Sequence, residues 1–200
     1  MTFDAVHDLQ KAFRGLVEAF SFPGHRVDLV DLARRIAPRV GDPSVNPTLA
    51  LGAAVLVDQD VGYAVVGNPA LASFLVEWSS SAPKDLDTAP LVVMADFDDG
   101  ELAKVLGRSS VGTLADPQGG ATVLVGVEDL AAGSDWTWSG PGLEHPSVGP
   151  LPAGDAWVKA RNAATSEFPL GVDLAFFDRK GRFMALPRTT RLAPATRREA

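Results

Sequence analysis

The residues best suited to bind a ligand follow the last long apolar run of the chain, in the stretch L-P-R-T-T at 186–190. Pro187 ends the strand that we expect before it, and this directs Arg188, Thr189 and Thr190 outward. A guanidinium offers a planar fork of N–H donors that fits the oxygens of a phosphate or phosphonate, and two neighbouring hydroxyls would add to it. These three residues form the candidate ligand-binding site.

Arg188 also has a structural interpretation. Asp173 is a carboxylate inside the otherwise apolar stretch 168–174, which precedes the final hairpin. Arg188 would then pair with Asp173, or with another carboxylate, and lock that hairpin. On the sequence alone both interpretations stay open.

Three other polar groups favour structural explanations. Asp58 and Asp60 could hold magnesium or a substrate hydroxyl, but a polar exit from a buried helix explains them better. His25 could bind an anion, yet a histidine alone in a loop is more often a surface group. The acidic stretch 96–100 is like a calcium loop, but its spacing is broken and Gly107 stands where the bidentate glutamate belongs. We expect a solvated turn there, whose acids favour the next helix.

The residue inventory restricts catalysis. The chain has no cysteine and three histidines, none of them paired at i, i+4 spacing. This removes thiol nucleophiles, disulfides, iron-sulfur ligation and cysteine-type zinc sites. The patterns G-x-x-x-x-G-K-[ST], G-x-G-x-x-G and G-x-S-x-G are absent as well. We therefore predict no catalytic residue, no metal site and no cofactor.

Length and composition indicate one globular domain. The 200 residues are 46% hydrophobic and 22% charged. We expect a single domain over 1–192 and a polar tail over 193–200. The net charge of −7 disfavours binding to nucleic acid or to an anionic membrane. Because the sequence shows no secretory signal and no apolar run near the roughly 20 residues of a membrane span, we expect a cytoplasmic protein.

Apolar periodicity predicts helices interleaved with strands. A helical stripe runs from about Asp4 to Phe20, so we expect its central Phe13 to be buried. The pair Asn46-Pro47 is typical of a cap and first turn, and it predicts a buried helix that ends near Val57. Further helices are expected at 69–78, 100–106 and 155–164, and strands at 63–66, 91–95, 121–127, 136–138, 172–177 and 182–186.

The remaining segments are connections. Residues 178–181 read as a hairpin turn, and 133–154 as a long surface loop with one short strand in it. The basic segment 26–39 has no clear type. Strands that alternate with helices and close in a hairpin indicate an α/β three-layer fold with a mixed central sheet.

The stretch F-P-L-G-V-D-L at 168–174, the hairpin after it and L-P-R-T-T at 186–190 resemble the PhnH family. PhnH is a subunit of the bacterial carbon-phosphorus lyase core complex, which breaks down phosphonates. Blocks within 13–24, 112–122 and 140–142 agree in the same order, so the resemblance runs from about residue 5 to 192. Val61 departs from it, since we expect threonine there, and this weakens a polar role for the neighbouring aspartates.

The resemblance implies a fold similar to type I pyridoxal-phosphate transferases, without the lysine that binds the cofactor. It implies a non-catalytic or accessory subunit, acting with PhnG, PhnI and PhnJ when phosphonate is transferred to the ribose of ATP to form ribose 1-phosphonate 5-triphosphate. Whether the chain alone forms a homodimer stays open. Two alternatives stay open: a free-standing pyridoxal-phosphate enzyme, although the five lysines fall on polar helix faces or turns, and a phosphonate-binding module.

Overall fold

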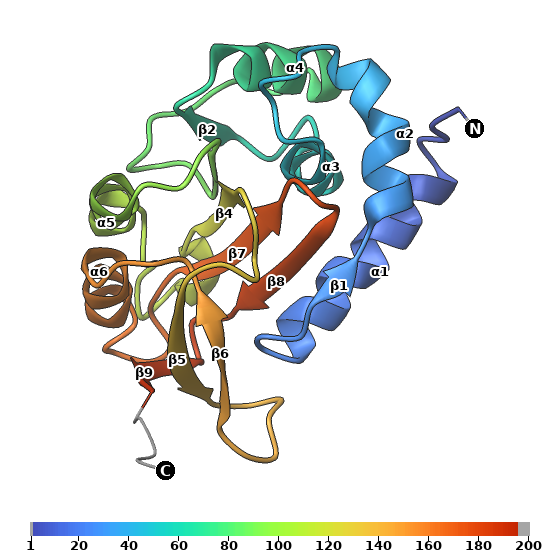
Figure 1. Cartoon of the computed structure of the whole chain (residues 1–200). Helices are drawn as coiled ribbons and strands as arrows, with labels where there is room; N and C mark the ends of the chain where they lie inside the picture. Colours follow the sequence, from blue (N-terminus) through green and yellow to red (C-terminus); the bar gives the residue numbers. More distant parts are fainter. Residues whose placement is uncertain (1, 196–200) are drawn as a thin grey trace.

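A six-stranded mixed sheet forms the centre of the protein (Figure 1), whose computed structural model describes residues 2–195. Four neighbouring strands are parallel, in the order β7-β4-β3-β2, and β8 and β1 extend the sheet beyond β7 through antiparallel pairs. The strands are β1 (Val27–Asp28), β2 (Tyr63–Val66), β3 (Leu91–Met94), β4 (Thr122–Val127), β7 (Asp173–Asp178) and β8 (Arg182–Leu186).

Helices cover both faces of this sheet. Side chains that alternate along each strand enter two separate cores, as the twofold repeat of a strand requires. One core lies under α1 (His7–Ser21), α2 (Val30–Val40), α3 (Pro47–Leu56) and α4 (Pro69–Ser79), and the other under α5 (Asp99–Arg108) and α6 (Ala156–Ala164). The predicted α/β fold with a mixed central sheet is confirmed, and the central strands are continuously apolar because both faces are covered.

A second, three-stranded sheet has the order β6-β5-β9, formed by β5 (Ser134–Ser139), β6 (Ser147–Leu151) and β9 (Arg191–Pro194). The strand expected at 136–138 lies within β5, but the expectation of a long loop with only this one strand over 133–154 was wrong, because β6 pairs with β5 there as a hairpin. Trp136 and Trp138 point to the buried face of β5, and the chain end supplies the second neighbour of that strand.

The expected boundary at residue 192 falls inside β9. Ala193 and Pro194 pair with Thr137 and Trp136 of β5, so the ordered domain reaches beyond the expected limit. The rest of the expected tail, residues 196–200, lies outside the described residues. None of the described helices is long and apolar enough to cross a membrane.

Helix α1 presents a different face to the core from the one expected. Phe13 is 51% exposed, so the prediction that it is buried was wrong. Small residues face inward instead: Ala12 and Ala19 are buried, and a Cβ on Gly15 would lie 3.1 Å from Val27. These small side chains let the helix lie close to β1 and β8, and larger apolar side chains are left on the outer face.

The segment of unclear type, 26–39, contains β1 and most of α2. The Asn46 cap was predicted correctly: its side-chain oxygen accepts from the backbone N–H groups of Thr48 at 3.0 Å and Leu49 at 3.3 Å. Its amide also donates to the Phe177 carbonyl at 2.9 Å, which ties the start of α3 to the end of β7.

Candidate functional site

The structure brings Arg188 and Asp173 together. The Arg188 guanidinium donates to Oδ2 of Asp173 from Nη2 at 2.6 Å and from Nε at 3.0 Å. The backbone N–H of Arg188 donates to Oδ1 at 2.7 Å, and both side chains are largely buried. This is the contact that the structural interpretation of Arg188 predicts, and it joins the start of β7 to the segment after β8.

Two carbonyl groups take most of the remaining donors of Arg188. Its Nη1 donates to Pro117 at 2.7 Å and its Nη2 to Gly120 at 3.3 Å. A Cβ on Gly120 would lie 2.7 Å from Nη1, so this glycine makes room for the guanidinium. Four of the five guanidinium N–H groups thus have partners within the chain. Little of Arg188 is left for a ligand.

Arg161 was not predicted as a site residue. It holds the segment that carries Arg188 by hydrogen bonds to its main chain. This fully buried side chain of α6 donates to the carbonyls of Thr190 at 2.7 Å and Pro187 at 2.6 Å. Burial lowers its pKa to about 10, and the nearby Asp173 opposes that shift, so the guanidinium stays charged at neutral pH. The available signal was its spacing: Arg161 lies four residues after the buried Trp157, on the apolar face of α6.

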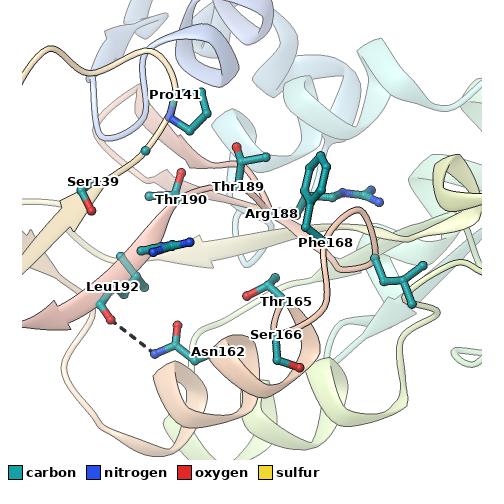
Figure 2. A pocket seen from close by; sticks show the side chains of 13 residues that line it. Ser139, Pro141, Asn162, Thr165, Ser166, Phe168, Arg188, Thr189, Thr190 and Leu192 are labelled. Carbon is teal, nitrogen blue, oxygen red and sulfur yellow. Dashed lines mark hydrogen bonds between the residues drawn. The ribbon is translucent and has the colours of Figure 1, made fainter. Parts of the chain in front are cut away.

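A cavity of about 710 Å³ opens beside this braced segment (Figure 2). The predicted residues Arg188, Thr189 and Thr190 all line it. Thr190 is only 1% exposed, and its Oγ1 has no hydrogen-bond partner within residues 2–195. The remaining lining residues are Ser139, Gly140, Pro141, Asn162, Thr165, Ser166, Phe168, Leu170, Arg191 and Leu192.

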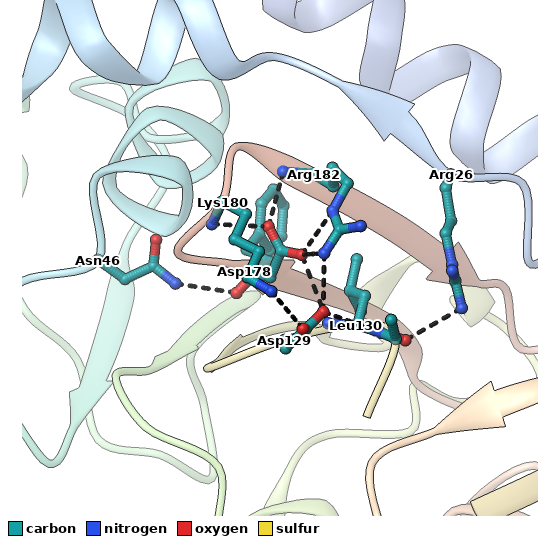
Figure 3. Close-up of polar contacts among 9 residues, drawn as sticks. Arg26, Asn46, Asp129, Leu130, Asp178, Lys180 and Arg182 are labelled. Atoms are coloured by element: carbon teal, nitrogen blue, oxygen red, sulfur yellow. Dashed lines mark hydrogen bonds and ion pairs between the residues drawn. The ribbon is translucent and has the colours of Figure 1, made fainter. Parts of the chain in front are cut away.

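A second polar cluster lies at the other end of β7 (Figure 3). Asp178 is fully buried and accepts from the backbone and the Nε of Arg182, each at 2.8 Å, and from the backbone of Lys180 at 2.9 Å. Asp129 accepts from Arg182 Nη2 at 2.7 Å and also from Lys180. Every charge in this cluster has a partner of opposite sign, so it closes the hairpin turn at 178–181.

The contacts in this cluster also shift the pKa values of Asp129 and Arg182. The hydrogen bond from Lys180, then that from the backbone of Ala131, lowers the pKa of Asp129 to about 2. Hydrogen bonds from Arg182 to Asp178 and Asp129 raise the pKa of that arginine. Both shifts favour the charged forms, which agrees with a structural network.

The other polar candidates have structural partners. Asp58 accepts from the backbone N–H groups of Asp60 and Val61, which forms a turn at the exit of α3. His25 lies 3.0 Å from Glu18 on the surface. Asp98 accepts from Glu101 N at 2.8 Å and caps α5. Within residues 2–195, no three acidic or histidine side chains gather in a way that could hold a metal ion.

Comparisons with known proteins agree with the resemblance of the sequence. The family model described as bacterial phosphonate metabolism protein (PhnH) matches residues 2–193. The chain belongs to the PhnH family. One relative, HtxG of Stutzerimonas stutzeri, is named as a C-P lyase subunit; it is 34% identical, over 92% of this chain and 85% of its own length. PhnH of Rhizobium meliloti (strain 1021), named as a subunit of alpha-D-ribose 1-methylphosphonate 5-triphosphate synthase, is 31% identical over 94% and 92%.

Proposed function

We propose that this PhnH-family chain is an accessory, non-catalytic subunit of a carbon-phosphorus lyase assembly. The assembly transfers a phosphonate to the ribose of ATP and so makes a ribose 1-phosphonate 5-triphosphate. The observation that carries the proposal is the family match over residues 2–193, together with relatives named as subunits of such systems. We place the assembly in the cytoplasm.

The state of the polar groups supports an accessory role. The arginines and aspartates of both polar clusters are paired with each other and with backbone groups. The three histidines lie at exposed positions and have only carboxylates as charged partners among the described residues. None of them is hydrogen-bonded to a hydroxyl in the part of the chain that the structure describes, so no histidine base is paired with a hydroxyl nucleophile there.

A fold like that of type I pyridoxal-phosphate transferases is part of the proposal, without the cofactor. A pyridoxal-phosphate enzyme needs a lysine beside its cofactor pocket, where it forms the Schiff base. The cavity beside Arg188 is lined by no lysine. All lysines of the chain are exposed, namely Lys11, Lys84, Lys104, Lys159 and Lys180. Absorbance near 400 nm after addition of pyridoxal phosphate tests this alternative, and we expect no band.

The outer face of α1 offers a surface for a partner. Val6, Phe13 and Val17 repeat at helical spacing, and they are 75%, 51% and 49% exposed. An apolar stripe of this kind on a subunit is a common feature of interfaces. We propose that it meets one of PhnG, PhnI and PhnJ in the assembly, and a second copy of the chain when the protein is alone.

Co-expression tests the proposed function. The tagged chain is expressed with PhnG, PhnI and PhnJ of the same source, captured, and analysed by gel filtration. We expect one stable complex that contains all four proteins, and no phosphonate turnover by the chain alone. A complex of the other three that forms without this chain, and makes the ribose phosphonate equally fast, would overturn the proposal.

A further inference from the structure

The cavity beside Arg188 has the charge of an anion-binding site. The described residues that line it include two arginines, Arg188 and Arg191, and no aspartate or glutamate, in a protein whose net charge is −7. The charge of Arg188 is balanced by Asp173, 2.6 Å away. Arg191 is exposed, and its guanidinium has no hydrogen bond or ion pair with any other of the residues 2–195. Among the described residues, the positive charge of Arg191 therefore has no compensating carboxylate.

Arg161 adds to this positive potential. It is fully buried behind the segment that carries Thr189 and Thr190, and among the described residues it has no carboxylate within 4.0 Å. A cation buried in protein is screened less than one in water, so its field reaches the neighbouring cavity. Its two hydrogen bonds also fix the main chain of residues 187–190, which sets the positions of the lining side chains.

Neutral donors also line the cavity. Thr190 is one of the lining residues, and its hydroxyl is buried without a partner among the described residues, although buried polar groups are usually paired. Thr189 and Ser139 add hydroxyls from the segment after β8 and from the end of β5. Figure 2 shows Thr189 and Thr190 on the segment after β8, Ser139 on β5 and Phe168 on a separate loop, and the Phe168 side chain is exposed. Hydroxyls beside a guanidinium suit the oxygens of a tetrahedral oxyanion.

We propose that this cavity binds the phosphate or phosphonate group of an organic ligand, and that Arg191 is its charged contact while Arg188 positions the segment. Its volume of about 710 Å³ lies within the range of about 300 to 1,000 Å³ that is usual for small-molecule sites. The site therefore has room for a ligand of nucleotide size. The inference rests on the proposed function, because phosphonate and ATP are the substrates of the proposed assembly.

Isothermal titration calorimetry tests this site with ATP, methylphosphonate and inorganic phosphate as separate probes. The full-length chain is titrated both alone and in its complex with PhnG, PhnI and PhnJ. We expect saturable binding of ATP or methylphosphonate, and weaker binding of inorganic phosphate, which lacks the organic part. Arg191→Gln should weaken this binding about tenfold or more, since it removes a charged hydrogen-bond donor. Thr190→Val should weaken it less.

Arg34→Gln is the matched control, because Arg34 is an exposed arginine of α2 outside the cavity lining. It should leave the affinity unchanged. Absence of binding by every probe, in both the free chain and the complex, would overturn the inference, and so would equal affinities of wild type and Arg191→Gln. Entry of the chain into the complex is scored separately. A chain that assembles but binds no probe refutes only this inference, and one that binds but never assembles refutes only the accessory role.

Discussion

Arg188 contacts both carboxylate oxygens of Asp173, Oδ1 through its backbone N–H and Oδ2 through its guanidinium. The two residues are separated by the whole β7-β8 hairpin, and their contact closes it at the open end. The same guanidinium reaches the carbonyls of Pro117 and Gly120, before β4. One side chain thus connects three segments that approach the sheet from the same edge.

A double-mutant cycle measures this contact. Arg188→Ala and Asp173→Ala should each lower the free energy of unfolding by about 3 kcal/mol, because each leaves a largely buried charge without its partner. The double variant should lose less than the sum by at least about 1 kcal/mol. Urea denaturation of the four proteins provides the values. Additive losses would show that the two charges are not coupled.

The Phe13→Ala variant tests whether Phe13 contributes to assembly with the partner subunits rather than to the stability of the fold. Because the ring of Phe13 is 51% exposed, we expect its removal to cost less than about 1 kcal/mol of unfolding free energy. Leu16→Ala is the control on the same helix: Leu16 is buried, and its truncation should cost about 2 to 5 kcal/mol. Capture by the partner subunits should weaken for Phe13→Ala. Unchanged capture would mean that the apolar stripe of α1 is not an interface.

Low pH should remove the contribution of Asp129 to the free energy of unfolding. Its pKa is about 2 in the folded protein, below the ordinary 3.8, so its stabilising effect is complete above about pH 4. The effect disappears as the pH falls from about 4 to 2, where the folded form also becomes protonated. The difference in unfolding free energy between wild type and Asp129→Asn should therefore shrink over that interval. A difference that is constant from pH 7 to 2 would argue against the ion pairs of Asp129.

Substitution of alanine for two glycines should change the stability of the protein in opposite directions. In β4, a Cβ on Gly126 would lie 2.0 Å from the backbone oxygen of Ala95, so Gly126→Ala must displace main chain and should cost about 3 kcal/mol. In α5, a Cβ on Gly107 would meet nothing within 4 Å, and Gly107→Ala should stabilise by about 0.5 to 1 kcal/mol. The midpoints of thermal melts, compared with that of the wild type, test both expected changes in stability. Similar midpoints for the two variants would contradict the close approach of Ala95 to β4.

Local sequence patterns predicted most of the central sheet. The strands at 63–66 and 182–186 were placed with their observed bounds, since glycines and turn residues flank short apolar runs there. The second sheet was missed because its middle strand, β5, is paired with β9, more than fifty residues later in the chain. The periodicity of α1 indicated a helix but not its orientation: the small residues Ala12 and Gly15 pack inward and Phe13 faces out.

For the candidate site, the sequence predicted the segment correctly, but it did not show which of its residues have structural contacts and which are free to bind a ligand. Arg188, Thr189 and Thr190 do line one cavity, as adjacent residues after a strand would. That four guanidinium donors of Arg188 are already occupied depends on Asp173, Pro117 and Gly120, which no local pattern connects. Arg161 was missed because an arginine in a helix is usually on the surface, and here it is buried against carbonyls.

The pairing of β9 outside the central sheet has a consequence for the cavity. β5 is the middle strand of the second sheet, and one of its two neighbours consists of residues 191–194. Residues of the same strand, Arg191 and Leu192, line the cavity. The six-stranded sheet contains no residue of β9, so separation of β9 from β5 would leave the strand pairs of that sheet intact and remove this wall of the cavity. Ligand binding in the cavity therefore depends on the pairing of β9 with β5, and not on the six-stranded sheet alone.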